Sequence, residues 1–181
     1  MLIKLPEMLK RRSPLEGLHL GVVLFNEDPK KLGRVKVMIQ GIWDGVPVDK
    51  LPWCYPMNPY GLGGDEDVSW FSVPEVGNEV IVWFPYLDPH LPYYIGYLQS
   101  TKTHQPDFDA NYPQMYGWVD SKGNKFVVDK QEDYILFKHH SGSYVKFLSD
   151  GTVEVKVTKD IKFDVDGDYN VKTVTATWNH K

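Results

Sequence analysis

The sequence predicts an all-β protein: a small barrel in its N-terminal half, followed by a region of repeated strands. Two observations predict this class. Short runs of β-branched and aromatic residues, bounded by Gly, Pro and Asp, recur along the 181 residues, and no long stretch has helical periodicity. From Gly117 onward, blocks that open with apolar–polar alternation follow one another at a short, nearly fixed period, which indicates a repeat architecture.

Composition and charge exclude several classes of function. The net charge of −4 argues against general nucleic-acid binding and against a polybasic membrane anchor. The single cysteine, Cys54, permits no intrachain disulfide, and no apolar run approaches the length of a membrane span. Lys4, Glu7 and Lys10 interrupt the apolar residues of the N-terminus, so we expect no signal peptide. If the protein acts outside a cell, we expect it to leave by lysis or inside an assembled particle.

Residues 1–17 are predicted to form an arm and residues 18–98 a small closed or partly closed barrel. The strands expected in the barrel are His19–Phe25, Gly33–Gln40, Glu79–Phe84 and Tyr93–Leu98. Gly33 is expected to permit a turn or bulge before its strand. Pro74 and Gly77 are expected to frame the turn that begins the strand at Glu79.

Two tryptophans of the barrel, Trp53 and Trp83, have two interpretations. Large aromatic side chains either fill a core or anchor an interface. Core packing is the preferred interpretation for both, and contact with a partner protein is the alternative.

Residues 99–116 are predicted to be a linker, and residues 117–181 a repeat region. The blocks of the repeat begin at Phe126, Tyr134, Tyr144, Val153, Ile161 and Tyr169. Side chains alternate between the two faces of a strand. In the block that begins at Val153, valines therefore lie on one face, and Glu, Lys and Thr lie on the other.

A lone meander of such strands would expose a long apolar stripe and open strand edges. Three intertwined copies would remove both faults, with about nine apolar side chains buried per layer, three from each chain. A single-chain coil with three faces needs longer blocks than these. The sequence therefore predicts a homotrimer. Its predicted core residues are Val153, Val155, Val157, Ile161, Phe163, Val165, Tyr169 and Val171.

Four motifs occur in a fixed order along the barrel. They are GRVKVMIQG (Gly33–Gly41), LPWCYPMNPYGLGG (Leu51–Gly64), VPEVGNEVIVWF (Val73–Phe84) and YYIGYL (Tyr93–Leu98). In this order they resemble the OB-fold (oligosaccharide/oligonucleotide-binding) barrel at the base of central spikes in contractile-tailed phages, type VI secretion systems and R-type tailocins. The blocks of residues 117–176 resemble the triple-stranded β-helix that follows this barrel. Some members carry a lysozyme domain in between, for which the linker leaves no room here.

The resemblance implies a fold class and a mechanical role. The fold would be an N-terminal OB-fold barrel followed by an intertwined trimeric β-helix. The barrel would dock on the tail hub protein, and the needle would pierce the target cell's outer membrane when the sheath contracts. The protein would thus be a structural component of a virion's tail baseplate and not an enzyme. The alternatives are an OB-fold nucleic-acid-binding module, disfavoured by the excess of acids in the barrel, and a cell-wall lytic enzyme with a β-helical tail.

Several residue clusters could carry chemistry, but each has a simpler interpretation. They are Asp65, Glu66 and Asp67 after the Gly61–Gly64 stretch; His139 with His140; Asp164, Asp166 and Asp168 with Gly167; and Cys54 with His90. The first is expected to be a solvated loop, because the Lys-Ser/Thr of a phosphate loop is missing. Adjacent histidines on a strand point to opposite faces. The acidic triplet lacks the Gly position and closing Glu of a calcium loop. We therefore predict no catalytic, cofactor or metal site.

The C-terminal sequence bears on how the needle ends. Many needles of this family end in an apex that binds iron through His-x-His motifs, but residues 177–181 contain only His180. Three copies of His180 could supply three ligands, although terminal residues usually fray. We expect a blunt spike that is capped by a separate small conical protein. A longer natural chain is the competing explanation.

Overall fold

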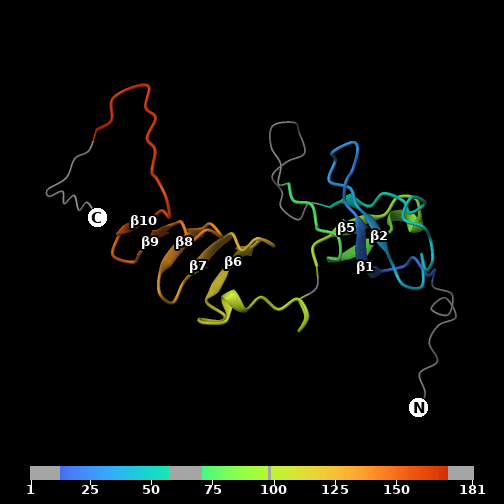
Figure 1. Cartoon of the computed structure of the whole chain (residues 1–181). Helices are drawn as coiled ribbons and strands as arrows, with labels where there is room; N and C mark the ends of the chain where they lie inside the picture. Colours follow the sequence, from blue (N-terminus) through green and yellow to red (C-terminus); the bar gives the residue numbers. More distant parts are fainter. Residues whose placement is uncertain (1–12, 58–70, 98, 171–181) are drawn as a thin grey trace, which may run out of the picture. The chain divides into compact units, whose positions relative to one another are not determined.

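The chain divides into two compact units, and the boundary in the sequence lies between His104 and Gln105. The computed structural model describes residues 13–57, 71–97 and 99–170 (Figure 1). Both units are built from β-strands with short 3₁₀ turns between them, so the predicted all-β class is confirmed. Within these described segments, no helix has the length and apolar character that a membrane crossing requires.

The first unit is a closed five-stranded barrel with the strand order β2-β1-β4-β5-β3. Its strands are β1 (Leu18–Phe25), β2 (Lys36–Met38), β3 (Tyr55–Pro56), β4 (Glu79–Trp83) and β5 (Tyr93–Ile95). Neighbouring strands are antiparallel except β3 and β5, which are parallel. Val35 and Cys54 exchange backbone hydrogen bonds of 3.1 and 2.8 Å. This bridge joins the chain before β2 to the chain before β3 and closes the barrel.

The barrel encloses a core of mostly β-branched and aromatic side chains. The core comprises Val23, Val35, Val37, Ile39, Trp43, Leu51, Cys54, Val80, Val82, Phe84 and Tyr94. The ring of Phe84 contacts Trp43 edge-on, with centroids 5.4 Å apart. A Cβ atom at Gly21 would lie 2.2 Å from Val37 Cγ1, so glycine allows β1 to approach β2 closely.

The turns expected in the barrel are confirmed. Gly33 has φ +73°, a left-handed conformation that favours glycine, just before the strand that includes β2. Gly77 has φ +92°, and its amide donates to Val23 O at 2.8 Å. The turn between Glu75 and Asn78 therefore aligns β4 beside β1. A 3₁₀ turn, η2 (Pro85–Leu87), follows β4.

The second unit is an antiparallel meander in which each strand pairs with its neighbours in sequence (Figure 1). After a 3₁₀ turn, η3 (Pro106–Phe108), its strands are β6 (Met115–Val119), β7 (Lys125–Asp129), β8 (Tyr134–Lys138), β9 (Tyr144–Phe147) and β10 (Val153–Lys156). A Cβ atom at Gly117 would lie 1.9 Å from Phe126 O, so only glycine permits the close approach of β6 to β7.

A buried carboxylate holds the turn between β7 and β8. Asp129, with 2% of its surface exposed, accepts a 2.6 Å hydrogen bond from Asn111 Nδ2 and bonds from the amides of Gln131 and Glu132. Burial alone would raise the pKa of Asp129, but these hydrogen bonds outweigh it and lower the pKa below its usual value. The ionised side chain thus fixes the end of β7 and the start of β8.

In the single chain, the strands of the second unit differ in extent from the predicted repeat at both ends. The predicted linker ends earlier than expected, because β6 begins at Met115. The block Ile161–Asp168 forms no strand, and residues 157–170 are exposed and without regular structure. The segment contains Asp160, Asp164, Asp166, Asp168 and Gly167, and Asp and Gly are residues that strands disfavour. Residues 171–176 of the last block lie outside the described residues.

The core predicts the effect of truncating Phe84. We expect Phe84→Ala to lower the free energy of unfolding by about 3–5 kcal/mol, since the ring is 1% exposed and lies against Trp43 and His19. The control Tyr86→Ala removes a ring that is 96% exposed and should change stability by less than about 0.5 kcal/mol. Urea unfolding followed by circular dichroism measures both. Equal losses would contradict the position of Phe84 in the core.

Candidate functional site

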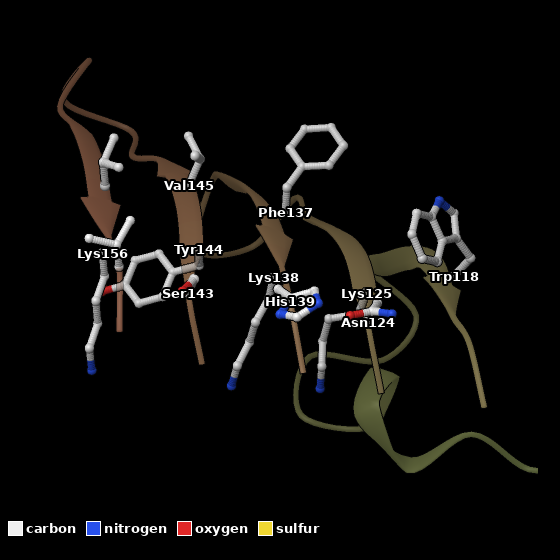
Figure 2. A pocket seen from close by; sticks show the side chains of 12 residues that line it. Trp118, Asn124, Lys125, Phe137, Lys138, His139, Ser143, Tyr144, Val145 and Lys156 are labelled. Carbon is white, nitrogen blue, oxygen red and sulfur yellow. The ribbon is translucent and has the colours of Figure 1, made fainter. Parts of the chain in front are cut away.

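Strand register gives the second unit one continuous apolar face. Directly paired residues of antiparallel strands point to the same side of a sheet. The pairing aligns two rows on one side, each with one residue from every strand. The first row is Trp118, Phe126, Phe137, Val145 and Val155. The second row is Tyr116, Val128, Ile135, Phe147 and Val153. Figure 2 shows Trp118, Phe137 and Val145 on the same side of the ribbon.

This needle face, as we call the two rows, is uncovered. Trp118, Phe137 and Val155 expose 48%, 51% and 57% of their surfaces. A hollow of about 370 Å³ runs along the first row and continues to Val157. Soluble monomers rarely expose a contiguous apolar surface across a whole sheet, and such surfaces mark interaction sites.

The opposite side of the same sheet carries charged side chains along its end rows, while the apolar residues Val127 and Leu136 lie on its middle strands. Lys125, Lys138 and Lys156 extend from it, with Tyr144 between the last two (Figure 2). Lys125 forms an ion pair with Asp107. An antiparallel sheet with one apolar and one charged face normally has water on the charged side and protein on the other. The needle face is therefore the side that lacks the protein cover expected for it.

The predicted trimer core overlaps this face only in part. Val153 and Val155 lie on it, opposite in facing to Glu154 and Lys156 as predicted, and Val157 follows β10 directly. Four other predicted positions lie in the segment without strands: Ile161, Phe163, Val165 and Tyr169. The last, Val171, lies outside the described residues. Sequence reasoning left out the aromatic residues on β6 to β8. Their signal was present as alternation in the blocks at Phe126 and Tyr134.

The barrel also carries apolar residues on its outside. Pairing aligns Leu18 with Trp83 and Tyr93, and Leu20 with Ile81 and Ile95. Leu18, Leu20 and Trp83 expose 69%, 51% and 41% of their surfaces. The preferred interpretation of Trp83 as a core residue is therefore wrong, because it lies on the outer side of β4. We call these six residues the outer barrel face.

Trp53 belongs to a charged cluster beside the barrel core. The guanidinium of Arg34 donates to both carboxylate oxygens of Asp28, at 2.6 and 2.9 Å, and lies 5.0 Å from the centroid of Trp53. Asp28 also accepts from the amides of Lys30 and Leu32 at 2.9 Å. The hydrogen bond from Arg34 holds the pKa of Asp28 well below its usual value. The cluster fixes the loop between β1 and β2.

The candidate nucleophile is inaccessible. Cys54 is 0% exposed, and burial raises the pKa of its thiol to about 12, so the reactive thiolate does not form near neutral pH. His90 is exposed, and its amide donates to Asp88. The arrangement therefore gives no support to a catalytic Cys–His pair.

The other predicted clusters do not form a metal site within the described segments. The rings of His139 and His140 lie 4.0 Å apart, and His140 contacts Asn124 through its amide and Nδ1. Among the described residues, no three His, Cys, Asp or Glu side chains gather closely enough to hold a metal ion. Asp164, Asp166 and Asp168 are exposed and belong to no strand. The remaining candidates, Gly61–Gly64, Asp65, Glu66, Asp67 and His180, lie outside the described residues.

Comparison with known families agrees with the architecture of the barrel. Residues 19–98 match the family model of the type VI secretion system/phage-baseplate injector OB domain. The match lies within the barrel unit and confirms the resemblance carried by the four ordered motifs. No curated protein matches the chain. The chain thus combines a barrel that is similar to this injector domain with a sheet that has an uncovered apolar face.

The Asp28–Arg34 pair predicts a pH dependence of stability. Because the folded pKa of Asp28 is depressed, the pair contributes stability above the ordinary carboxyl pKa near 4 and loses it as the pH falls through the folded pKa. Asp28→Asn should therefore destabilise the protein at neutral pH, and the difference from wild type should shrink below about pH 4. Unfolding in urea at a series of pH values measures this. A difference that stays constant into acid would contradict the ion pair.

Burial of Cys54 predicts its reactivity. Iodoacetamide at neutral pH should leave the native protein unmodified, because the thiol is covered and its pKa is raised. The same reagent should modify the single cysteine fully after denaturation. Intact mass spectrometry distinguishes the two states. Rapid modification of the native protein would restore the nucleophile hypothesis.

Proposed function

We propose that this protein is the homotrimeric central spike of a contractile injection machine in a virion's tail baseplate. One observation carries the proposal: an injector OB domain is joined to a sheet whose needle face is apolar and uncovered. The role is mechanical. Contraction of the sheath supplies the energy, and the spike contributes stiffness.

Self-association of the needle face is supported by its composition. Each strand places two apolar side chains on the face, whereas three per chain and layer were predicted from the sequence. A layer of three strands, one from each copy, would therefore bury six apolar side chains. Large apolar side chains that are already half covered gain roughly 1 kcal/mol each on full burial. Over both rows this amounts to on the order of 10 kcal/mol per chain, before entropy. Partner strands would also pair the edges of β6 and β10 that are open among the described strands.

The number three follows from the resemblance of the repeat blocks to a triple-stranded β-helix. Three copies around an axis enclose one continuous core, with the side that carries Lys138 and Lys156 turned to the water and the target envelope. The intertwined geometry is part of the proposal. Two copies face to face would form a sandwich instead, and the mass in solution distinguishes the two.

The barrel supplies attachment in this proposal. Its outer face, with Leu18, Leu20 and Trp83 exposed, is apolar in the way that stable protein interfaces are at their centres. We assign this face to docking on the tail hub protein. A separate small protein would close the free end of the needle, and the needle would cross the outer membrane of the target cell.

The proposal predicts a trimer that depends on Phe137. Light scattering coupled to size exclusion should give the mass of three chains. Phe137→Asp places one carboxylate per chain in the needle core, and each costs more than the roughly 2–7 kcal/mol of a neutral buried polar group without partners. The variant should dissociate at micromolar concentration.

The matched control is Lys138→Ala, one residue further along β8 and on the opposite side of the sheet. This variant should keep the trimer, with a change in stability of less than about 0.5 kcal/mol. A wild-type monomer would overturn the proposed spike. A trimer that survives Phe137→Asp would show that another surface holds the copies together.

A further inference from the structure

The barrel has a second hollow, of about 470 Å³, which the proposed assembly does not use. Its walls are apolar and come from Phe25, Pro29, Val48 and Trp53. The rings of Phe25 and Trp53 lie 5.9 Å apart and are tilted by 52°. Two exposed acids, Glu27 and Asp49, line the rim. Asp49 forms an ion pair of 3.3 Å with Lys50, and because both side chains are largely exposed, a cation of a ligand can replace Lys50 at little cost. A concave site with apolar walls and a few polar groups is typical of binding pockets.

Lys36 lies in this hollow and is only 9% exposed. Its ammonium donates to the carbonyls of Val48 and Asp49, each at 2.9 Å, and lies 5.2 Å from the centroid of Trp53. No carboxylate pairs with it among the described residues. An ammonium has three N–H donors, so one remains for an acceptor from outside. A buried cation without a counter-ion is costly, which favours binding of such an acceptor.

The walls of the hollow are fixed before anything binds. Asp28 accepts hydrogen bonds from Arg34 and from amides of the loop that contains Pro29. Trp53 is held by the guanidinium of Arg34 and by the ring of Phe25. A rigid pocket loses little conformational entropy on binding, so a small contact area suffices for recognition.

We propose that this hollow binds an extended segment of a partner protein, with an apolar side chain packed against the joined rings of Phe25 and Trp53 and a neighbouring Lys or Arg on Glu27 and Asp49. A backbone carbonyl of the segment accepts the third N–H of Lys36. The two rim acids select a basic neighbour and repel a phosphate backbone, so the site does not suit a nucleic acid. The site lies in the barrel and does not depend on trimer formation.

The probe is a synthetic array of capped hexapeptides, each with one Leu, Phe, Trp or Pro beside Lys, Arg, Ser or Glu. The full chain is applied to the array, and the best and worst peptides are measured by calorimetry. Peptides with a basic neighbour should bind, because Lys or Arg is attracted by the acids of the rim. Peptides with Glu at the same place should bind at least about tenfold more weakly, because two negative charges then repel each other. A labelled oligothymidine is measured in parallel.

Three variants test the named residues. Lys36→Met keeps the length of the side chain and should weaken binding about tenfold, since a hydrogen bond to a charged group is lost. The double change Glu27→Gln with Asp49→Asn alters exposed residues only, so the fold is kept; it should reduce the preference for basic neighbours about fivefold. The control Asp88→Asn changes an exposed acid outside the hollow and should have no effect.

The result expected is selective binding of apolar–basic peptides that both pocket variants reduce and the control does not. Binding without preference for the neighbouring charge, no binding by any peptide at millimolar concentration, or displacement of the peptides by oligothymidine would each overturn the proposal. Circular dichroism of each variant verifies the fold. The mass of the complex is recorded with the same samples, so a monomer that still binds would separate this site from the proposed spike.

Discussion

The rest of the second unit depends on one constraint: a sheet with one apolar face must have that face covered. Register makes the constraint strict. A slip of one residue between strands would move every apolar side chain to the charged side. Gly117 brings β6 against β7, and Asp129 fixes the turn that follows, so the two rows of the needle face stay aligned. The sheet therefore concentrates its exposed apolar side chains on one surface, and the proposed association of copies rests on that surface.

The barrel satisfies the same requirement within a single chain. Its closure through Val35 and Cys54 leaves no open edge at that point, and Phe84 fills the interior with Trp43 and the valines. Polar groups beside the core are matched individually, as with Arg34 and Asp28. The barrel therefore has the features of a unit that folds alone, whereas the sheet has those of a unit completed by others. The outer barrel face is not part of this core, so the core does not depend on it.

Features that depend on local pattern could be predicted from the sequence. Alternation located β1, β4 and the starts of β7 to β10, and turn chemistry located Gly33 and Gly77. The parallel partner β3 has only two residues and could not be recognised. The side of the barrel on which Trp83 lies depends on its pairing with Leu18 across β1, and the contact of Arg34 with Asp28 depends on a folded loop. The block at Ile161 alternates in the same way but forms no strand, and its Asp164, Asp166, Asp168 and Gly167 are residues that strands disfavour.

Pairing between sequence neighbours alone has a consequence for how such a protein changes over generations. Because β6 to β10 form a simple meander, no strand is threaded between distant parts of the chain. Insertion or loss of one hairpin would alter the length of the sheet by about 10 Å and leave the direction and facing of every other strand as before. Loss of a single strand would reverse the chain. Evolution can therefore lengthen or shorten the sheet of the second unit in steps of two strands without a change in the barrel.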